Sequence, residues 1–326
     1  MNGSDLKDLT IIGGGPTGLF AAFYAGMRGA SARIIESLPE LGGQLTALYP
    51  EKYIYDVGGF PRITARDLAA NLIEQGLQFG PEVRLGERVQ DLVREDGHFI
   101  VTTDKGHRYA SRAVIIAAGK GAFSPRVLEC PGYEEFLERG VAHHVKDPAA
   151  YAGKRVLIVG GGDSAVDWAL ALKDAVARLI LIHRREGFRA HAHSMRLLRA
   201  AVEAGEVELL THKEVRAIHG DECVRAVTIF DNRTDEEITF EVDAVLALIG
   251  FKPDLGPVAR WGIELEKNCI KVSPTMQTSI PGVYAAGDIV WHEAKLELIA
   301  TGFSEAAIAV NNAIHYIDPK ARVNPG

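Results

Sequence analysis

The 326-residue sequence has few cysteines and lacks long hydrophobic runs. Cys130, Cys223 and Cys269 stand too far apart for a CxxC motif or a zinc site. No apolar run reaches the ~18 residues that a membrane-spanning helix needs, and the first one, LTIIGG, predicts a strand rather than a signal peptide. These absences predict a protein without a membrane segment from a reducing compartment, the cytoplasm.

Positive charge is also in deficit, because 36 lysines and arginines against 43 acidic residues give a formal net charge of −7. This balance argues against nucleic acid as a partner. The histidine pairs His143–His144 and His191–His193 have no carboxylate or cysteine at a familiar ligand spacing. We therefore predict no metal site.

Glycine is abundant, with 34 residues, and it twice opens the same pattern. The segments LTIIGGGPTGLFAAFYAGMRGASARIIES and KRVLIVGGGDSAVDWALALKDAVARLILIHRR each predict a strand, a glycine turn, a helix and a strand. A β meander and an apolar strand follow each unit, and these strands end at Gly119 and Gly250. The chain therefore looks duplicated at the scale of a domain.

After Gly250 no third unit begins. The segment IPGVYAAGDIV predicts a buried strand ending at Asp288, and TGFSEAAIAVNNAIHYI predicts a long helix. We expect both to complete the first domain. The predicted fold class is α/β, with two Rossmann-like, three-layer ββα domains: residues 1–123 and 250–326 form the first, and residues 124–249 form the second, inserted one. The two adjacent connections resemble a hinge.

Between the two units, Thr64 and Asp67 have the spacing of a helix capping box, and Leu68, Leu72 and Ile73 form an apolar stripe after them. This predicts an amphipathic helix that begins at Thr64. Turn residues at Asp104, Lys105 and Gly106 predict a hairpin in the first meander.

The first fingerprint, GxGxxG, consists of Gly13, Gly15 and Gly18. These glycines allow a tight turn, a close approach of the backbone to a pyrophosphate, and close packing of helix on strand. The N-terminus of the helix offers free N–H groups to the phosphates. Glu36 stands 23 positions after Gly13, where a carboxylate accepts hydrogen bonds from ribose hydroxyls. The unphosphorylated ribose that this implies favours FAD.

The second fingerprint, GxGxxA, consists of Gly160, Gly162 and Ala165, and Asp163 and Ser164 open its helix. The position 23 after Gly160 is His183, and Arg184, Arg185 and Arg189 follow it. A carboxylate there would repel a 2′-phosphate, whereas guanidinium groups bind phosphate through paired, charge-assisted hydrogen bonds. A solvated basic loop is the alternative. The position relative to the fingerprint favours an NADPH site made of Gly160, Gly162, Asp163, Ser164, His183, Arg184, Arg185 and Arg189.

The motifs GGGPTGL, GGQL, GGGDSAVDWAL, HRREGFRA and VYAAGDI, in this order over nearly the whole chain, resemble the low-molecular-weight thioredoxin reductases. Those enzymes carry a CxxC disulfide just before the second fingerprint, where this sequence has GVAHHVKDPAAYAGKRVLIVGGG and no cysteine. Without a dithiol, two electrons cannot be relayed to thioredoxin. The segments VKDPAAYAGKRVLIVGGGDSAVDWAL, FRAHAHS and IATGFSEAAIAVNNAIHYIDPKAR are similar to a sister branch, the thioredoxin-reductase-like ferredoxin (or flavodoxin)–NADP⁺ reductases.

This resemblance implies FAD, NADPH, a homodimer and exchange of electrons with ferredoxin or flavodoxin. It also implies residue roles: Thr17 in the pyrophosphate loop, Glu36 at the FAD ribose, Gln44 at the flavin side, Tyr49 stacked on the isoalloxazine, Val89 at the adenine through its backbone, Phe123 near the domain junction, and Asp288 at the ribitol or pyrophosphate. Tyr49 and Tyr53 could instead be half-buried core aromatics, and the GGQL context favours Tyr49 over Tyr53 for the flavin.

Family members usually continue past DPKARV with a tail that caps the second flavin face. Since this chain ends at Gly326, we expect the cap to be absent, truncated or supplied differently.

The sequence thus predicts an enzyme, a ferredoxin–NADP⁺ reductase in which the cofactor carries the chemistry and no side chain acts as acid or base. We expect the helix beginning near Thr301 to direct its N-terminus toward the flavin. Lys52, Arg62 and Arg66 are candidates for docking an acidic partner. Three alternatives remain: an NADPH diaphorase or quinone reductase, an NADPH-responsive binding protein that keeps FAD as structure, and a thioredoxin reductase acting through a separate CxxC partner.

Overall fold

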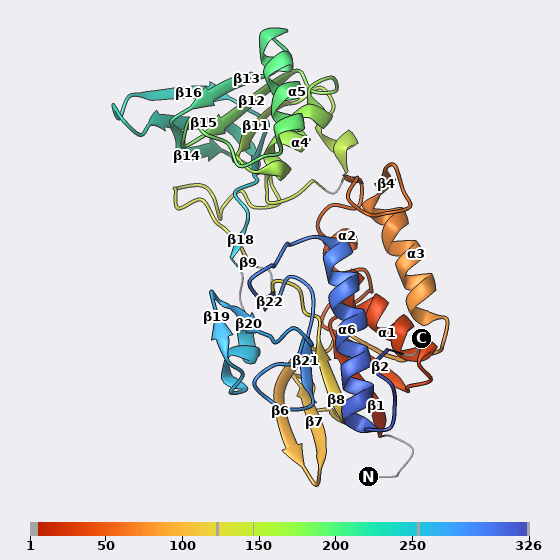
Figure 1. Ribbon diagram of the computed structural model, residues 1–326. Coiled ribbons are helices and arrows are strands. Elements are labelled where there is room, and N and C mark those ends of the chain that lie inside the picture. Colours follow the sequence, from red (N-terminus) through yellow and green to blue (C-terminus); the bar gives the residue numbers. More distant parts are fainter. Residues whose placement is uncertain (1–5, 122–123, 146, 253–254, 325–326) are drawn as a thin grey trace. The chain divides into compact units, whose positions relative to one another are not determined.

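The computed structural model describes residues 6–121, 124–145, 147–252 and 255–324 and divides the chain into two compact units (Figure 1). Unit 1 comprises residues 1–123 and 253–326, and unit 2 comprises residues 124–252. In Figure 1 unit 1 accordingly contains both the red start and the blue end of the chain, whereas unit 2 runs from yellow-green to cyan. The inserted segment that the sequence predicts, residues 124–249, ends just before the end of unit 2.

Unit 1 is built on a seven-stranded sheet whose parallel part has the strand order β5-β2-β1-β8-β21. Strands β1 and β8 bury Leu9, Ile11 and Ile115 completely, as expected of parallel strands that are covered on both faces. The bounds of these strands are β1 (Lys7–Ile12), β2 (Ala32–Glu36), β5 (Glu82–Leu85), β8 (Arg108–Ile116) and β21 (Val283–Ala285).

Strand β8 has two partners on the same side. Its first half pairs antiparallel with β7 (His98–Thr103), and β7 and β8 form the hairpin that the sequence predicts. Strand β7 also pairs antiparallel with β6 (Val89–Glu95). The second half of β8 pairs in parallel with β21, with Ile115 opposite Tyr284. The segment that follows unit 2 in the chain therefore completes the sheet of unit 1.

The helices of unit 1 are α1 (Pro16–Met27), α2 (Gln44–Ala47), α3 (Ala65–Leu77), α6 (Ile299–Ile317) and the 3₁₀ helix η2 (Gly256–Arg260). Helix α1 packs against both α3 and α6. The predicted start of α3 is confirmed, because Thr64 Oγ1 accepts a hydrogen bond from the N–H of Asp67 (3.1 Å) and Leu68 and Leu72 are buried. Short strands complete the unit: β3 (Tyr53–Ile54), β4 (Ile63–Thr64), β19 (Leu265–Glu266), β20 (Cys269–Lys271) and β22 (Val290–Trp291).

Unit 2 contains a parallel sheet of order β10-β17-β11-β12-β13 and an antiparallel sheet of order β14-β15-β16. The bounds are β10 (Val141–Ala142), β11 (Arg155–Val159), β12 (Arg178–His183), β13 (Glu208–Thr211), β14 (Lys213–Gly220), β15 (Val224–Asp231), β16 (Glu237–Glu241), β17 (Ala244–Ala247), α4 (Asp163–Leu172), α5 (Ala192–Glu203) and the 3₁₀ helix η1 (Pro148–Tyr151).

Alternate residues of β11 enter two different cores of unit 2. Ile158 packs with Trp168 of α4, whereas Leu157 packs with Val227 of β15. The parallel sheet therefore lies between a helical layer and the antiparallel sheet, and the predicted three-layer α/β arrangement is confirmed. The first and last strands of unit 2, β9 (Ser124–Pro125) and β18 (Phe251–Lys252), pair antiparallel with each other.

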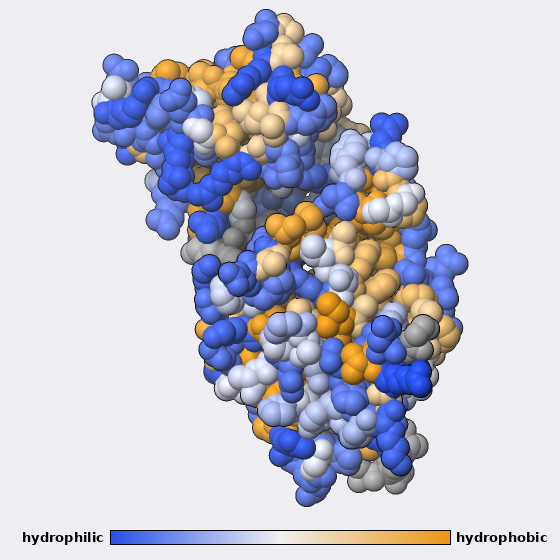
Figure 2. All heavy atoms as spheres, viewed as in Figure 1, coloured by the Kyte–Doolittle hydropathy of each residue, from blue (hydrophilic) through white to orange (hydrophobic). Residues whose placement is uncertain are grey.

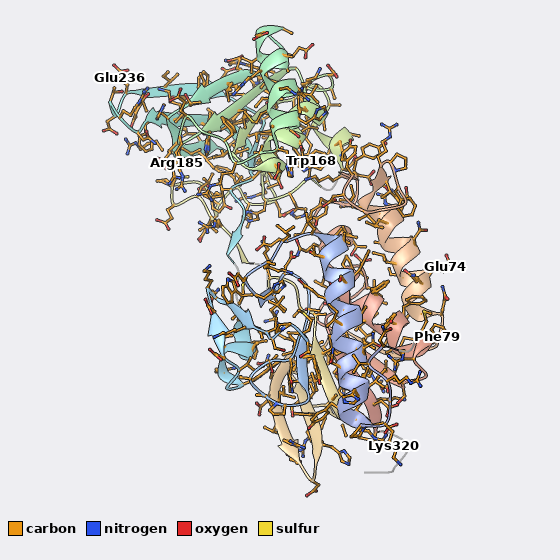
Figure 3. The ribbon with its side chains drawn as sticks, in the orientation of Figure 1. Glu74, Phe79, Trp168, Arg185, Glu236 and Lys320 are labelled. Carbon is orange, nitrogen blue, oxygen red and sulfur yellow. The ribbon has the colours of Figure 1, made fainter. Side chains whose placement is uncertain are left out.

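No helix in the described part of the chain is both long and apolar enough to cross a membrane. The surface in Figure 2 is largely hydrophilic, with apolar residues gathered in patches along the helices of unit 1. Met27, Leu77 and Phe79 are among the exposed apolar residues of this unit, and Figure 3 labels Phe79 beyond the end of α3.

Candidate functional site

The first glycine loop of unit 1 is shaped by two contacts that leave no room for a side chain. A Cβ on Gly13 would stand 2.4 Å from the carbonyl oxygen of Ala117, and one on Gly18 would stand 1.9 Å from the carbonyl oxygen of Gly13. Gly15 caps α1, which begins at Pro16, where a missing N–H costs no hydrogen bond. These contacts hold the predicted GxGxxG turn against the N-terminus of α1, where the free backbone N–H groups of a helix start suit a phosphate.

Glu36 ends β2 and its carboxylate is held at this loop. Its Oε2 accepts the N–H of Gly14 (2.6 Å), and its Oε1 accepts the N–H of Leu38 (2.8 Å) and the hydroxyl of Ser37 (3.0 Å). Carboxylate oxygens retain further lone pairs when so held. A ribose diol beside the glycine loop would find a preoriented acceptor there.

Two other segments of unit 1 approach the start of α1. A Cβ on Gly43 would stand 2.9 Å from the Cα of Gly15, so the turn before α2 lies against the glycine loop. Thr17 Oγ1 lies beside Gly287 and Gly302, 2.8 and 2.5 Å from where their Cβ atoms would stand. The turn after β21 and the first part of α6 thus meet at Thr17.

The side chains of Gln44, Tyr49 and Asp288 lie near the start of α1 and carry polar groups that have no partner among the described residues. Within the described residues, the side-chain oxygens or nitrogens of Thr17, Gln44, Tyr49 and Asp288 form no hydrogen bond or ion pair, and a Cβ on Gly119 would stand 3.5 Å from Nε2 of Gln44. Such donors and acceptors around a helix N-terminus fit a ligand that carries phosphates and hydroxyl groups. These residues therefore fit FAD.

Tyr49 and Asp288 influence each other electrostatically. Burial, together with the carboxylates of Asp288 and Asp56, raises the pKa of Tyr49 to about 12, so its phenol is neutral at physiological pH. Burial also raises the pKa of Asp288, and the ammonium group of Lys120 opposes this shift. Tyr53, in contrast, is 46% exposed and lies under the guanidinium of Arg62.

Sequence reasoning missed Glu305, a carboxylate buried on α6. Its Oε2 accepts the N–H of Gly287 (2.7 Å), Lys295 Nζ bonds both of its oxygens (2.8 and 2.9 Å), and His292 Nε2 lies 3.1 Å from Oε1. Glu305 therefore anchors the turn that carries Asp288. The available signal was a single acid within the apolar run GFSEAAIAV.

Three further predictions from the sequence concern Val89, Asp288 and Phe123. Val89 is buried at the start of β6, next to a bulge at Gln90 whose carbonyl accepts the Trp261 indole N–H (3.1 Å). The predicted strand end at Asp288 is wrong, because β21 ends at Ala285 and the left-handed Gly287 (φ +84°) turns the chain. Phe123 lies outside the described residues.

The second glycine loop, in unit 2, repeats the first, except that Ala165 stands in place of the third glycine. A Cβ on Gly160 would stand 2.4 Å from the carbonyl oxygen of Leu248 and 2.8 Å from the Cβ of Ala165. Gly162 caps α4, which begins at Asp163. The backbone N–H groups at this helix start suit an anion as well, and Ser164 in the first turn is exposed.

His183 supports the glycine loop and adds no positive charge, although the sequence pattern grouped it with the three arginines. Its ring lies 2.2 Å from where a Cβ of Gly161 would stand, and its Nε2–H donates to the carbonyl oxygen of Gly187 (3.2 Å). Burial lowers its pKa, and the cationic side chains of Arg184, Arg185 and Arg189 lower it further. The imidazole is therefore neutral at physiological pH.

Arg184, Arg185 and Arg189 lie on the exposed loop after β12, where Figure 3 labels Arg185. Their guanidinium groups have no hydrogen bond or ion pair with any described residue. The loop is tied to the start of α4, because Arg189 N–H donates to the carbonyl oxygen of Gly161 (2.7 Å) and His191 N–H donates to Asp163 Oδ1 (2.8 Å). Three cationic side chains, none paired within the described residues, are thus carried by a loop that is tied to the N-terminus of α4.

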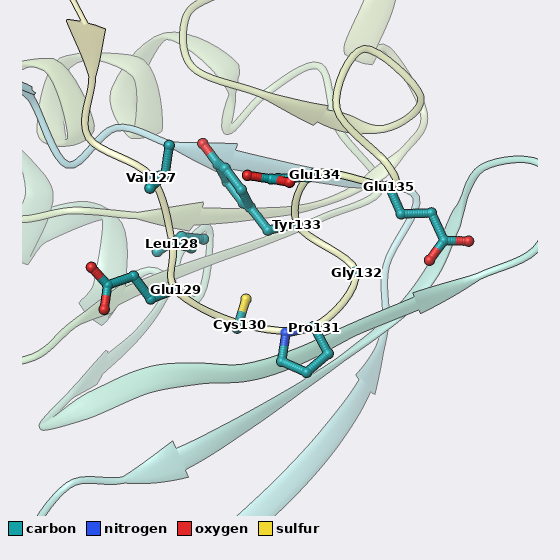
Figure 4. A pocket seen from close by; sticks show the side chains of 9 residues that line it. All are labelled: Val127, Leu128, Glu129, Cys130, Pro131, Gly132, Tyr133, Glu134 and Glu135. Atoms are coloured by element: carbon teal, nitrogen blue, oxygen red, sulfur yellow. The ribbon is translucent and has the colours of Figure 1, made fainter.

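The cysteines provide no dithiol, because all three in the described chain are free, and they are partly exposed. Cys130 lines a hollow of unit 2 formed by residues 127–135 (Figure 4), where burial raises the pKa of its thiol to about 11. This thiol is protonated at physiological pH and is a poor nucleophile. Among the described residues no group of three or more metal-ligating side chains occurs.

Comparison with protein families and curated proteins identifies relatives over the whole chain. A family described as pyridine nucleotide-disulphide oxidoreductase matches residues 7–313. A ferredoxin–NADP reductase of Thermus thermophilus is 58% identical over 323 residues, covering 99% of this chain and 96% of the relative. A ferredoxin–NADP reductase 2 of Shouchella clausii is 52% identical over 324 residues, covering 99% and 97%.

Solved structures of similar fold include thioredoxin reductases. That of Lactococcus lactis in its FR conformation has a TM-score of 0.83 at 26% identity, covering 95% of this chain and 99% of its own. That of T. acidophilum has a TM-score of 0.83 at 26% identity, covering 97% and 99%. These likenesses confirm the predicted two-domain fold.

Proposed function

Because this chain belongs to the pyridine nucleotide–disulphide oxidoreductase family, we propose that it is an FAD-containing ferredoxin–NADP⁺ reductase, which transfers electrons between NADPH and ferredoxin. The observation that carries this proposal is the difference between its two glycine loops. In unit 1 the carboxylate of Glu36, at the end of β2, is held at the glycine loop, and in unit 2 the loop after β12 carries arginines that have no partner among the described residues. One site is thus suited to a ribose diol and the other to a 2′-phosphate.

We assign FAD to unit 1, where its pyrophosphate would bind at the N-terminus of α1 beside Gly13, Gly15, Thr17 and Gly18. Glu36 would accept hydrogen bonds from the adenosine ribose, Asp288 would bind ribitol or pyrophosphate, Gln44 and Tyr49 would contact the flavin, and the backbone at Val89 would contact the adenine. Bound FAD supplies the conversion between hydride transfer and single-electron transfer. The protein binds and orients the cofactor and excludes water from it. Because the cofactor carries the chemistry, no side chain has to act as acid or base.

We assign NADPH to unit 2. Gly160, Gly162, Asp163 and Ser164 would surround its pyrophosphate, and Arg184, Arg185 and Arg189 would bind its 2′-phosphate, while the neutral His183 supports the loop between them. The N-terminus of α6, which begins at Ile299, is the element that we propose stabilises negative charge on the reduced flavin.

Three further features are part of the proposal. Flavodoxin is a second acceptor of the same acidic class, the active form is a homodimer, and the protein acts in the cytoplasm. Size-exclusion chromatography with light scattering tests the dimer directly. Thioredoxin reduction is not proposed, since that reaction needs a dithiol close to the flavin and the sequence has no CxxC.

A steady-state assay tests the proposed reaction. The FAD-loaded protein is given NADPH and increasing ferredoxin, and cytochrome c reports each electron that leaves ferredoxin. A rate that saturates at low ferredoxin concentration and prefers NADPH over NADH supports the reductase. Equal rates without ferredoxin, with a quinone as acceptor, would identify a diaphorase instead. A flavin that NADPH does not reduce would indicate a binding protein.

A further inference from the structure

Two parts of unit 2 hold the loop of residues 184–191. One is the parallel sheet with its helices, and the other is the antiparallel sheet. Arg189 and His191 tie the far end of the loop to the start of α4. Its near end is tied by Asn232, whose Nδ2 donates to the carbonyl oxygen of Arg184 (2.9 Å). Asn232 directly follows β15, so the antiparallel sheet reaches the loop that carries the arginines.

The orientation of the Asn232 amide is fixed by its partners. Its Nδ2 also donates to Glu214 Oε1 (2.9 Å), and its backbone N–H donates to the carbonyl oxygen of His212 (2.9 Å). A carbonyl and a carboxylate can only accept, so the nitrogen of the amide has to face both. A side chain of the same shape without two N–H groups would not fit this position.

We infer that Asn232 is a positioning residue for coenzyme selection, which holds the main chain at Arg184 so that the arginine cluster receives the 2′-phosphate. This inference rests on the proposed function, in which Arg184 and Arg185 bind that phosphate. NADH has the same adenosine and nicotinamide but no such phosphate. Loss of Asn232 therefore weakens NADPH binding and leaves NADH binding unchanged.

A merely structural role for Asn232 makes a different prediction. If the amide only fastened the antiparallel sheet to the rest of unit 2, its loss would weaken both coenzymes together and lower stability. The N232D variant keeps the shape but turns an acceptor toward the carbonyl of Arg184 and the carboxylate of Glu214. The N232A variant removes the tie without adding charge. T234D adds a negative charge in the same turn and retains Asn232, which makes it the matched control.

The experiment measures kcat and KM of the holoenzyme for NADPH and for NADH with ferricyanide as acceptor, and the inhibition constant of 2′,5′-ADP. We expect N232D to raise KM for NADPH and the inhibition constant of 2′,5′-ADP about 10-fold, with a smaller rise in N232A. The kcat at saturating NADPH, KM for NADH and all constants of T234D stay within about twofold of wild type.

Equal shifts for both coenzymes, or no shift in N232D, would overturn the inference. R185A separates this failure from failure of the proposed function. If R185A lowers the preference for NADPH and N232D does not, only the role of Asn232 is wrong. If neither variant alters the preference, the phosphate site itself has been assigned wrongly.

Discussion

The backbone N–H of Gly14 donates a 2.6 Å hydrogen bond to the carboxylate of Glu36, which stands at the end of β2. The corresponding pair in unit 2 is Gly161 and His183, where the imidazole ring packs directly on the glycine. Both pairs connect the middle glycine of a loop to the last residue of the next strand. The duplicated units thus share one geometry and differ in the chemistry placed at its end.

Replacement of Glu36 tests the ribose site. We expect E36A to lower FAD affinity about 10-fold or more, because hydrogen bonds to charged groups contribute about 1.5–3 kcal/mol each. Fluorescence titration of the apoprotein with FAD measures the change. E40A, which removes an exposed carboxylate from the following loop, is the control and should bind FAD like wild type. Equal affinities of E36A and E40A would contradict the assignment.

Replacement of the arginines tests the 2′-phosphate site. The double variant R184A/R185A should raise KM for NADPH about 10- to 100-fold, since charge-assisted hydrogen bonds to phosphate are lost, and should change KM for NADH little. R199A removes an exposed cation from α5 and serves as the control. If NADPH and NADH lose affinity equally, the loop supports the fold and does not select the coenzyme.

Replacement of Glu305 tests whether this carboxylate holds the turn that carries Asp288. In E305Q the buried ammonium group of Lys295 loses its counter-charge, and breaking a buried ion pair costs about 3–5 kcal/mol. We expect a lower unfolding midpoint of the apoprotein and weaker FAD binding, measured by thermal denaturation and FAD titration. E293Q, at an exposed position, should alter neither. An E305Q protein that folds and binds FAD with unchanged affinity would show that the anchor does not position Asp288.

Ionic strength tests docking of an acidic partner. Lys52 and Arg62 lie over the rings of Tyr49 and Tyr53, whereas Arg66 is paired with Glu51. We expect KM for ferredoxin to rise with salt, and K52E/R62E to raise it at low salt while kcat with ferricyanide stays unchanged. A KM for ferredoxin that does not depend on salt would rule out electrostatic docking.

The stability of unit 2 should depend on pH through Asp243. Hydrogen bonds from Arg155 lower the pKa of this carboxyl to about 2 in the folded protein, against an ordinary value of 3.8. Its stabilisation is therefore complete above pH 3.8 and is lost as the pH falls toward 2. D243N should unfold at a lower temperature than wild type at pH 7, and this difference should shrink at acid pH. D174N is the exposed control, and a difference that does not depend on pH would contradict the linkage.

The features that the sequence predicted correctly are local ones. Gly13 and Gly160 mark tight turns, Gly18 packs against the carbonyl group of Gly13, and Thr64 caps a helix through a residue three positions later, so each of these signals can be read in a short window of sequence. The return of the chain to unit 1 was also predictable, because an apolar strand and a long helix remained without a unit of their own.

The interactions that the sequence did not predict join residues far apart in the chain. Glu305 meets Gly287 and Asn232 meets Arg184 only because folding brings a helix or a sheet to a loop. His183 looked like part of a cationic cluster, yet burial and its arginine neighbours keep it neutral. Counting charges along the sequence reveals neither these long-range contacts nor the effect of burial on the pKa of His183.

The central claim, that this protein passes electrons from NADPH through FAD to ferredoxin, is tested most directly by anaerobic stopped-flow absorbance. The FAD-loaded protein is mixed with NADPH, and the reduced protein is then mixed with oxidised ferredoxin. We predict rapid bleaching of the flavin, followed by rapid reoxidation as ferredoxin is reduced. Bleaching followed by slow transfer to ferredoxin but rapid transfer to a quinone, or no bleaching by NADPH, would contradict the account.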